Sequence, residues 1–276
     1  MGGRGCAGRA CGSGGGRGHC QTEVTMVRGF YSAASALLAG LFRQELLSHN
    51  IANINLAGYK SLNTSMDEFE PKLLSRMPGV SMPGTVGVEV GQTSLGVAPI
   101  GTETYFAEGS LRDTKQPFDL AINGDGFFRI STPNGERFTR DGRFTRDENG
   151  NLATVDGYLL LGVDGQPVVV PQGETAIDAD GVIRVDNQAG DQIALAAFAN
   201  PVTDLQRDGA NTFAALGEAT ASTAAIRQGM LEMSNVDASR TMAQMISVAR
   251  AYEAAQRAVQ LQDEMTGKAV NEIGRL

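Results

Sequence analysis

Residues 48–60 read S-H-N-I-A-N-I-N-L-A-G-Y-K, and residues 231–237, near the other end of the chain, read L-E-M-S-N-V-D. Each block stands at the inner end of a long segment whose apolar residues recur at helical spacing. The two ends of the chain are therefore predicted to be a matched pair of helices around a different kind of middle. This layout is more typical of an assembly component than of an enzyme.

The composition limits the classes to which the chain can belong. With 276 residues, of which 42% are hydrophobic, it can bury one large core or two ordinary ones. Its 35 glycines, together with 11 Phe, 5 Tyr and no Trp, indicate many turns between strands of modest size. A net charge of −8 without a basic stripe argues against nucleic acid as a partner. Apolar runs fall short of the roughly 20 residues that span a bilayer, so membrane insertion is not expected.

The first 25 residues differ from the rest of the chain. They are rich in glycine, contain all three cysteines and lack the apolar core of a secretory signal. We expect residues 1–25 to form a disordered tail, or to be translated from a misplaced start upstream of a natural beginning at Met26. The alternative is a metal site at Cys6, Cys11, Cys20 and His19, which lacks the C-x-x-C pair of zinc sites. No metal or cofactor is therefore expected.

An amphipathic helix is predicted from Val27 onward. Its apolar positions Phe30, Ala34, Leu37 and Leu41 follow steps of three and four, and Ile51, ten residues on, belongs to the same stripe. Gly58 can adopt the left-handed conformation that ends a helix. The asparagines before it, Asn50, Asn53 and Asn55, either cap the fraying end or hydrogen-bond to a neighbouring chain, and the sequence leaves both open.

A second helix is predicted from a capping box at Ser234 and Asp237 to about Thr266. Its apolar seam is heptad-like: Met242, Met245, Ala249, Tyr252 and Val259. Both seams are narrow and interrupted by polar residues, so each helix would be marginal alone. We expect the helices to pair with each other and with other subunits. The alternative is that they pack on their own central domain as surface helices.

Between the helices, the pattern changes to strands and turns. Residues 118–122 alternate in polarity, and Gly124-Asp125-Gly126 leads into residues 127–130, which predicts a hairpin. The repeated R-F-T-R-D at 137–141 and 143–147 predicts two short strands around an Asp141-Gly142 turn. Further turns are expected at Pro133-Asn134-Gly135, Asn149-Gly150, Asp156-Gly157, Asp164-Gly165 and Asp180-Gly181. Strands are expected at 152–155, 168–170, 182–185 and 192–198. This spacing indicates a mostly antiparallel β domain.

Catalytic constellations are not found. The chain has two histidines, His19 in the tail and His49 on the first helix, so neither a nucleophile–histidine pair nor a histidine metal site can be assembled. We expect no enzyme. A secreted enzyme or carbohydrate-binding β domain with helical arms would need converging titratable groups, and a coiled-coil adaptor that binds a different protein is a further alternative.

Several short motifs carry a resemblance to a known family. They are N-I-A-N at 50–53, G-Y-K at 58–60, P-F-D-L-A-I-N-G-D-G-F-F at 117–128, F-T-R-D-G at 138–142, S-N-V-D at 234–237 and A-Y-E at 251–253. In this order they resemble the bacterial flagellar rod and hook protein family, from Met26 to the C-terminus. Leu56 departs from the pattern, since the family usually has Thr there. The size resembles the distal rod protein and its shorter proximal relative more than the larger hook protein.

The resemblance implies a subunit of the basal-body rod, the axial shaft that crosses the periplasm and transmits torque from motor to hook. Such subunits leave the cell through the flagellar type III export apparatus without a cleaved signal peptide. Their partners are copies of themselves and the other axial proteins of rod and hook. A hook-type axial protein remains an alternative. We expect the terminal segments to become ordered only on assembly.

The expected fold is α+β. Residues 26–65 and 230–276 are predicted to form paired helices, a coiled-coil-like axial domain, and residues 66–229 a mostly antiparallel β domain. The expected assembly interface consists of Leu37, Leu41, Asn50, Ile51, Asn53, Gly58, Tyr59, Lys60, Ser234, Asn235, Val236, Asp237, Met242, Met245, Ala249 and Tyr252.

Overall fold

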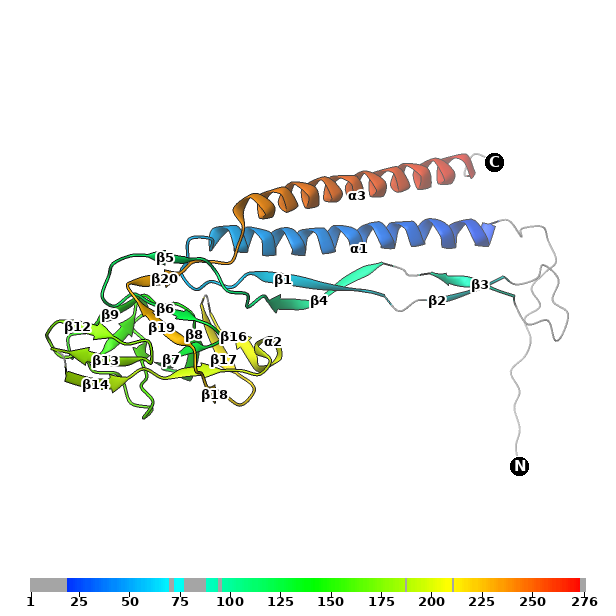
Figure 1. Ribbon diagram of the computed structural model, residues 1–276. Helices are drawn as coiled ribbons and strands as arrows, with labels where there is room; N and C mark the ends of the chain where they lie inside the picture. Colours follow the sequence, from blue (N-terminus) through cyan, green and yellow to red (C-terminus); the bar gives the residue numbers. More distant parts are fainter. Residues whose placement is uncertain are drawn as a thin grey trace, which may run out of the picture. The chain divides into compact units, whose positions relative to one another are not determined.

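The protein is α+β, with a long helix toward each end of the chain and antiparallel strands between them (Figure 1). The computed structural model describes residues 19–69, 72–76, 88–93, 96–186, 188–209 and 211–273. The helices are α1 (His19–Ala52), α2 (Pro201–Asp204) and α3 (Ala238–Ile273). Over the described residues, neither long helix offers a segment that is long and apolar enough to cross a membrane.

The strands are short, as the many turn signals predict. The first ten are β1 (Leu62–Glu68), β2 (Lys72–Arg76), β3 (Val88–Thr93), β4 (Val97–Thr104), β5 (Leu111–Asp113), β6 (Leu120–Asn123), β7 (Phe127–Thr132), β8 (Gly135–Thr139), β9 (Phe144–Arg146) and β10 (Leu152–Thr154). They are followed by β11 (Leu159–Leu160), β12 (Thr175–Ile177), β13 (Val182–Val185), β14 (Gln188–Gln192), β15 (Leu195–Ala197), β16 (Leu205–Arg207), β17 (Thr212–Ala215), β18 (Thr220–Ala221), β19 (Ala225–Gln228) and β20 (Met230–Glu232).

The largest described sheet has nine strands in the order β16-β17-β8-β7-β11-β10-β9, and β15 joins it between β7 and β18. A three-stranded sheet follows the order β12-β13-β14, and the remaining pairs are β1 with β4, β2 with β3, β6 with β19 and β5 with β20. The pairs with a described register are antiparallel, which confirms the predicted class of the middle.

Strand β7 places apolar side chains on both faces of the large sheet. Phe128 and Ile130 belong to a cluster of buried aliphatic and aromatic residues that includes Leu120 and Leu152. Phe127, one residue along, belongs to a second cluster with Phe138, Phe198 and Phe213. Successive residues of a strand point to opposite faces, so this one strand contributes to two apolar layers.

Most of the predicted turns are present where the sequence places them. Hairpins join β7 to β8, β9 to β10 and β12 to β13 at the expected Asn-Gly or Asp-Gly positions. Gly150, Gly157 and Gly181 have φ between 81° and 84°, the left-handed region that glycine occupies without strain. The N–H of Gly150 donates to the carbonyl of Asp147, three residues earlier, which agrees with a β-turn.

The predicted hairpin over residues 118–130 is wrong. Strand β6 pairs with β19, more than a hundred positions later in the chain, and β7 pairs with β8, β11 and β15. Gly124 does turn the chain, with φ 107°. Its carbonyl accepts a hydrogen bond from Arg140 and its N–H donates to Glu108, so side chains hold this turn and direct β7 into another sheet. The two short strands expected on either side of Asp141-Gly142 are present as β8 and β9, although they do not pair with each other and residues 141–142 are not assigned as a turn.

Two strand predictions are also only partly met. Residues 168–170 lie outside the strands, although Val169 forms an isolated bridge with Asn151. Residues 192–198 are divided between the end of β14 and β15.

The chain divides into two compact units. One contains Met1–Ala39, Glu68–Ala98 and Ala251–Leu276, and the other contains Gly40–Asp67 and Pro99–Arg250. This division differs from the expected one, because it cuts both long helices and separates residues 68–98 from the rest of the β-rich middle. The inner ends of α1 and α3 belong to the same unit as the large sheet.

In the first unit, α3 packs against α1. A Cβ atom added at Gly29 of α1 would lie 2.2 Å from Nε2 of Gln262 on α3, so the absence of a side chain permits this close approach. Ser35 of α1 contacts the start of β4, where its Oγ accepts a hydrogen bond from the N–H of Val97. The antiparallel pair of β2 and β3 belongs to the same unit.

The long helices differ from the prediction at their ends. Helix α1 begins at His19, so residues 19–25, expected in the tail, are helical. The glycine-rich composition ends at Gly18, and the residues after it carry no helix breaker until Gly29. The rest of the expected tail, residues 1–18 with Cys6 and Cys11, lies outside the described residues. Helix α3 continues to Ile273, past the expected end at Thr266.

The predicted capping box is wrong. The carboxylate of Asp237 accepts a hydrogen bond from the N–H of Arg240, three residues on, so Asp237 is itself the N-cap of α3. Ser234 lies outside the helix, where its Oγ accepts from the N–H of Val236. The acid therefore precedes the helix by one residue and does not stand in its first turn.

Candidate functional site

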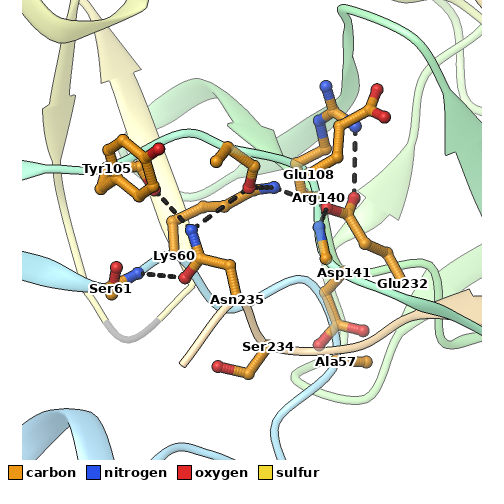
Figure 2. Close-up of polar contacts among 12 residues, drawn as sticks. Ala57, Lys60, Ser61, Tyr105, Glu108, Arg140, Asp141, Glu232, Ser234 and Asn235 are labelled. Carbon is orange, nitrogen blue, oxygen red and sulfur yellow. Dashed lines mark hydrogen bonds and ion pairs between the residues drawn. The ribbon is translucent and has the colours of Figure 1, made fainter. Parts of the chain in front are cut away.

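The two sequence blocks at the inner ends of the helices meet in space, within the unit that contains the large sheet (Figure 2). Lys60 Nζ lies 2.5 Å from Oε1 of Glu232, and both side chains are at most 2% exposed. The other carboxylate oxygen, Oε2, lies 3.2 Å from Nη1 of Arg140. We call the set of Lys60, Arg140 and Glu232 the buried charge triad.

Most of the remaining donors and acceptors of the buried charge triad are also engaged, and the exception is the buried Nε of Arg140, which has no hydrogen-bond partner. Lys60 Nζ donates to the carbonyl of Ala107, at 2.8 Å. Glu232 Oε1 accepts from the N–H of Gly109 at 2.9 Å, and Arg140 Nη2 donates to the carbonyl of Gly124. A buried ion pair is tolerated when its lone pairs and protons are satisfied in this way. Burial lowers the pKa of Lys60, and the Glu232 carboxylate beside it acts in the opposite direction.

Asn235 joins the same segments through its amide side chain. Its Oδ1 accepts from the N–H of Ser61 at 2.8 Å, and its Nδ2 donates to the carbonyls of Tyr105 and Ala107 (Figure 2). The block at 231–237 is thereby tied both to the chain after α1 and to the segment between β4 and β5. A side chain with both a donor and an acceptor group is suited to such a position.

Backbone groups of the two blocks approach too closely for side chains. The N–H of Gly58 donates to the carbonyl of Glu232 at 2.7 Å. Gly58 has φ 65°, and a Cβ there would lie 2.3 Å from the carbonyl carbon of Arg140. A Cβ at Gly109 would lie 1.8 Å from the carbonyl oxygen of Met233. Glycine is therefore required at both positions.

Tyr59 connects the end of α1 to the large sheet. Its ring is fully buried and lies against the guanidinium of Arg207 on β16, 4.9 Å from the ring centroid. Arg207 also donates from Nη2 to the carbonyl of Lys60 and stacks near Phe213. Burial raises the pKa of the Tyr59 hydroxyl, partly opposed by Arg207, and burial lowers the pKa of Arg207.

The asparagines at the end of α1 bond within their own chain. Asn50 Oδ1 accepts from the Tyr59 hydroxyl and from the N–H of Leu62, and its Nδ2 donates to the Leu62 carbonyl. Asn53 donates to the carbonyl of His49. Asn50 is thus a structural residue of the turn after α1, and Asn53 caps the helix end. His49 contacts the Tyr59 hydroxyl through Nδ1, at 2.9 Å.

The structure places the expected interface residues in two groups. Asn50, Gly58, Tyr59 and Lys60 are buried inside the chain around the buried charge triad, and Asn235 bonds to the same segments. The others lie at the helix ends or along the helices, half-buried or exposed: Leu37, Leu41, Ile51, Asn53, Ser234, Val236, Asp237, Met242, Met245, Ala249 and Tyr252. The buried residues have partners within the chain, and a role at a subunit interface stays a prediction for both groups.

Sequence reasoning missed the charged partners. Arg140 and Glu232 both lie within motifs that the sequence singles out, yet neither was selected, and Arg207 lies outside those motifs. One signal was available, since Glu232 is a single acid between the apolar residues Leu231 and Met233. Among the residues that the structure describes, no cluster of His, Cys, Asp or Glu side chains could hold a metal ion.

Comparisons with known proteins agree with the motifs. A family model described as the flagellar hook protein FlgE/F/G D1 domain matches residues 121–185, and one described as the flagellar basal body rod FlgEFG protein C-terminal matches residues 227–272. The second match includes Glu232, Asn235 and most of α3.

Full-length relatives are similar over most of their length. The flagellar hook-basal body complex protein FlhO of Bacillus subtilis is 32% identical, over 91% of this chain and 100% of the relative. The flagellar basal-body rod protein FlgG of the same species is 30% identical over 89% of this chain and 99% of its own. FlgF of Mesorhizobium japonicum is 34% identical over 81% and 88%. The chain therefore belongs to the family of flagellar hook and basal-body rod proteins.

Proposed function

We propose that the protein is a structural subunit of the bacterial flagellar basal-body rod. It polymerises through its terminal helices, with copies of itself and with other axial proteins, into the shaft that transmits torque from motor to hook. Relatives that are named as basal-body rod proteins match this chain over nearly their whole length. The helices also offer a surface suited to contacts between subunits.

The observation that carries the proposal is the apolar surface of the helices. On α1, Phe30, Leu38 and Leu41 are 47%, 66% and 49% exposed. On α3, large apolar side chains are also more than half exposed: Met242, Ile246, Leu261, Met265 and Val270. Exposed apolar residues of this number along two helices are typical of interaction surfaces. Head-to-tail contacts generate a filament when the rotation between successive subunits does not close into a ring, and this is the kind of contact that the proposal requires.

The spacing within α3 supports pairing of the helices in a coiled-coil manner. Seven of its less exposed residues follow alternating steps of four and three: Thr241, Met245, Val248, Tyr252, Ala255, Val259 and Gln262. This is the period of a heptad seam. The segments next to the inner ends of both helices meet at the buried charge triad, and the outer parts of the helices gain their full burial when neighbouring subunits join. Export through the flagellar type III apparatus without a cleaved signal follows from the same proposal.

The test places a charge on the apolar surface of α1. Leu41→Asp should abolish incorporation into hook–basal bodies isolated from a strain that lacks the native gene, because a carboxylate cannot be buried without a partner. The unfolding curve of the purified chain should stay unchanged, since Leu41 is half exposed. Leu216→Asp is the matched control, because Leu216 is 69% exposed on the β domain. Normal rods with Leu41→Asp would refute the interface.

A further inference from the structure

Glu232 is the residue at which the chain segments of the junction meet. Its side chain accepts hydrogen bonds from Lys60, Arg140 and the N–H of Gly109, and its carbonyl accepts from the N–H of Gly58. Arg140 precedes Glu232 in the chain by 92 positions, and Lys60 precedes it by 172 positions. One carboxylate thus joins the segment after α1, the segment before β5 and the turn after β8.

Glu232 is the buried acid that both cations share. Its carboxylate pairs with Lys60 and Arg140, and Glu108, which is exposed, is a further acid that acts on Lys60. Such a site is a poor source of stability, because desolvation of ions offsets much of their attraction, and apolar replacements of similar volume often match it. Its directional bonds do offer specificity, since they are satisfied in a single arrangement of the partners.

We propose that Glu232 is a positioning residue that fixes the segment after α1 and the segment before α3 in one position relative to each other, which we call their register. Because of the buried charge triad, this register is either fully formed or lost. If either block is displaced, cations are left buried without a counter-charge, so partly slipped arrangements are strongly disfavoured. The inner ends of both helices then begin from one defined geometry, which an axial subunit needs in every copy.

Hydrogen exchange on the full chain tests the register directly. In Glu232→Gln, the amides of Gly58, Ser61 and Met233 should exchange roughly 100-fold faster together, because removal of one partner of a buried ion pair is strongly destabilising. None of these amides donates to the Glu232 carboxylate itself. The β7–β8 hairpin should keep its protection. If only Gly109 exchanges faster, whose amide bonds to the replaced carboxylate, Glu232 does not position the two blocks.

Matched variants keep this test decisive. Glu136→Gln removes a carboxylate that pairs with Arg129 at the same 2.5 Å distance, but at a position that is 38% exposed, and it should leave all these amides unchanged. Lys60→Met keeps the Arg140–Glu232 pair and should speed exchange in both blocks to a smaller degree. A response confined to one block in either junction variant overturns the proposal.

A second experiment separates register from stability and rests on the proposed function. The triple variant Lys60→Met, Arg140→Met, Glu232→Leu replaces all three charges by apolar groups. It should recover the urea midpoint lost in Glu232→Gln, while its incorporation into isolated hook–basal bodies stays at least 10-fold below that of the native chain. Normal incorporation of the triple variant would refute positioning. Failure of the native chain to incorporate would instead refute the rod function, and the exchange result would stand independently.

Discussion

The β-domain core and the junction around the buried charge triad are equally buried, yet different interactions stabilise them. Phe128, Ile130 and Leu152 are fully buried among other apolar side chains. Lys60 and Glu232 are as deeply buried, but among ions, amides and backbone groups. Apolar contact is non-directional, so a core adjusts to small shifts. Hydrogen bonds and ion pairs are directional, so those of the junction form in a single geometry and are lost when the segments shift.

The largest expected difference between the regions comes from adding one methyl group. Gly58→Ala should cost about 3 kcal/mol or more, because a left-handed backbone costs roughly 1–2 kcal/mol and forced overlap about as much again. Gly165→Ala is the matched control, since Gly165 has φ 72° in an open turn with nothing within 4 Å of the added Cβ. It should cost about 1 kcal/mol. Urea unfolding measures both, and equal losses would show that the junction yields as easily as a surface turn.

A smaller difference is expected from exchanging one cation for another. Arg207→Lys should cost about 1–2 kcal/mol, because lysine cannot stack flat against Tyr59 while donating to the Lys60 carbonyl. Arg184→Lys on β13 should change stability by about 0.5 kcal/mol or less, because its pair with Asp178 is 48% and 41% exposed. Comparable losses in the two variants would mean that the stacking geometry contributes little.

The sequence predicted the features that depend on near neighbours. Helical periodicity located α1 and α3, and Asn-Gly or Asp-Gly pairs located most turns, because both follow from local backbone preferences. The hairpin at 118–130 failed for a tertiary reason. A Gly-Asp-Gly turn does not reveal that Arg140 and Glu108 hold it or that β19 arrives to pair with β6.

The candidate site was located but its chemistry was not. Residues 50–60 and 231–237 were singled out together, and they do meet. Lys60, however, was expected at the assembly interface, and its ion pair with Glu232 was not predicted, because this partner lies 172 positions away in the sequence. Asn50 shows the same limit: the sequence left open whether its amide bonds inside or outside the chain, and the partner at Leu62 decides it.

The smallest effect concerns the buried Tyr59 hydroxyl and depends on pH. Burial raises the pKa of Tyr59 above its ordinary value of 10.0, so the folded state favours the neutral phenol. That preference contributes stability fully below pH 10 and loses it as the pH rises toward the raised value, because the unfolded chain ionises first. Tyr59→Phe should cost about 1 kcal/mol at pH 8 by removing the bond to Asn50. Urea titrations should show this difference shrinking between pH 8 and pH 11, while the remaining tyrosines, present in both proteins, cancel. A stability difference between the two proteins that stays constant with pH would mean that the hydroxyl reaches solvent, and that the junction is less buried than the β-domain core.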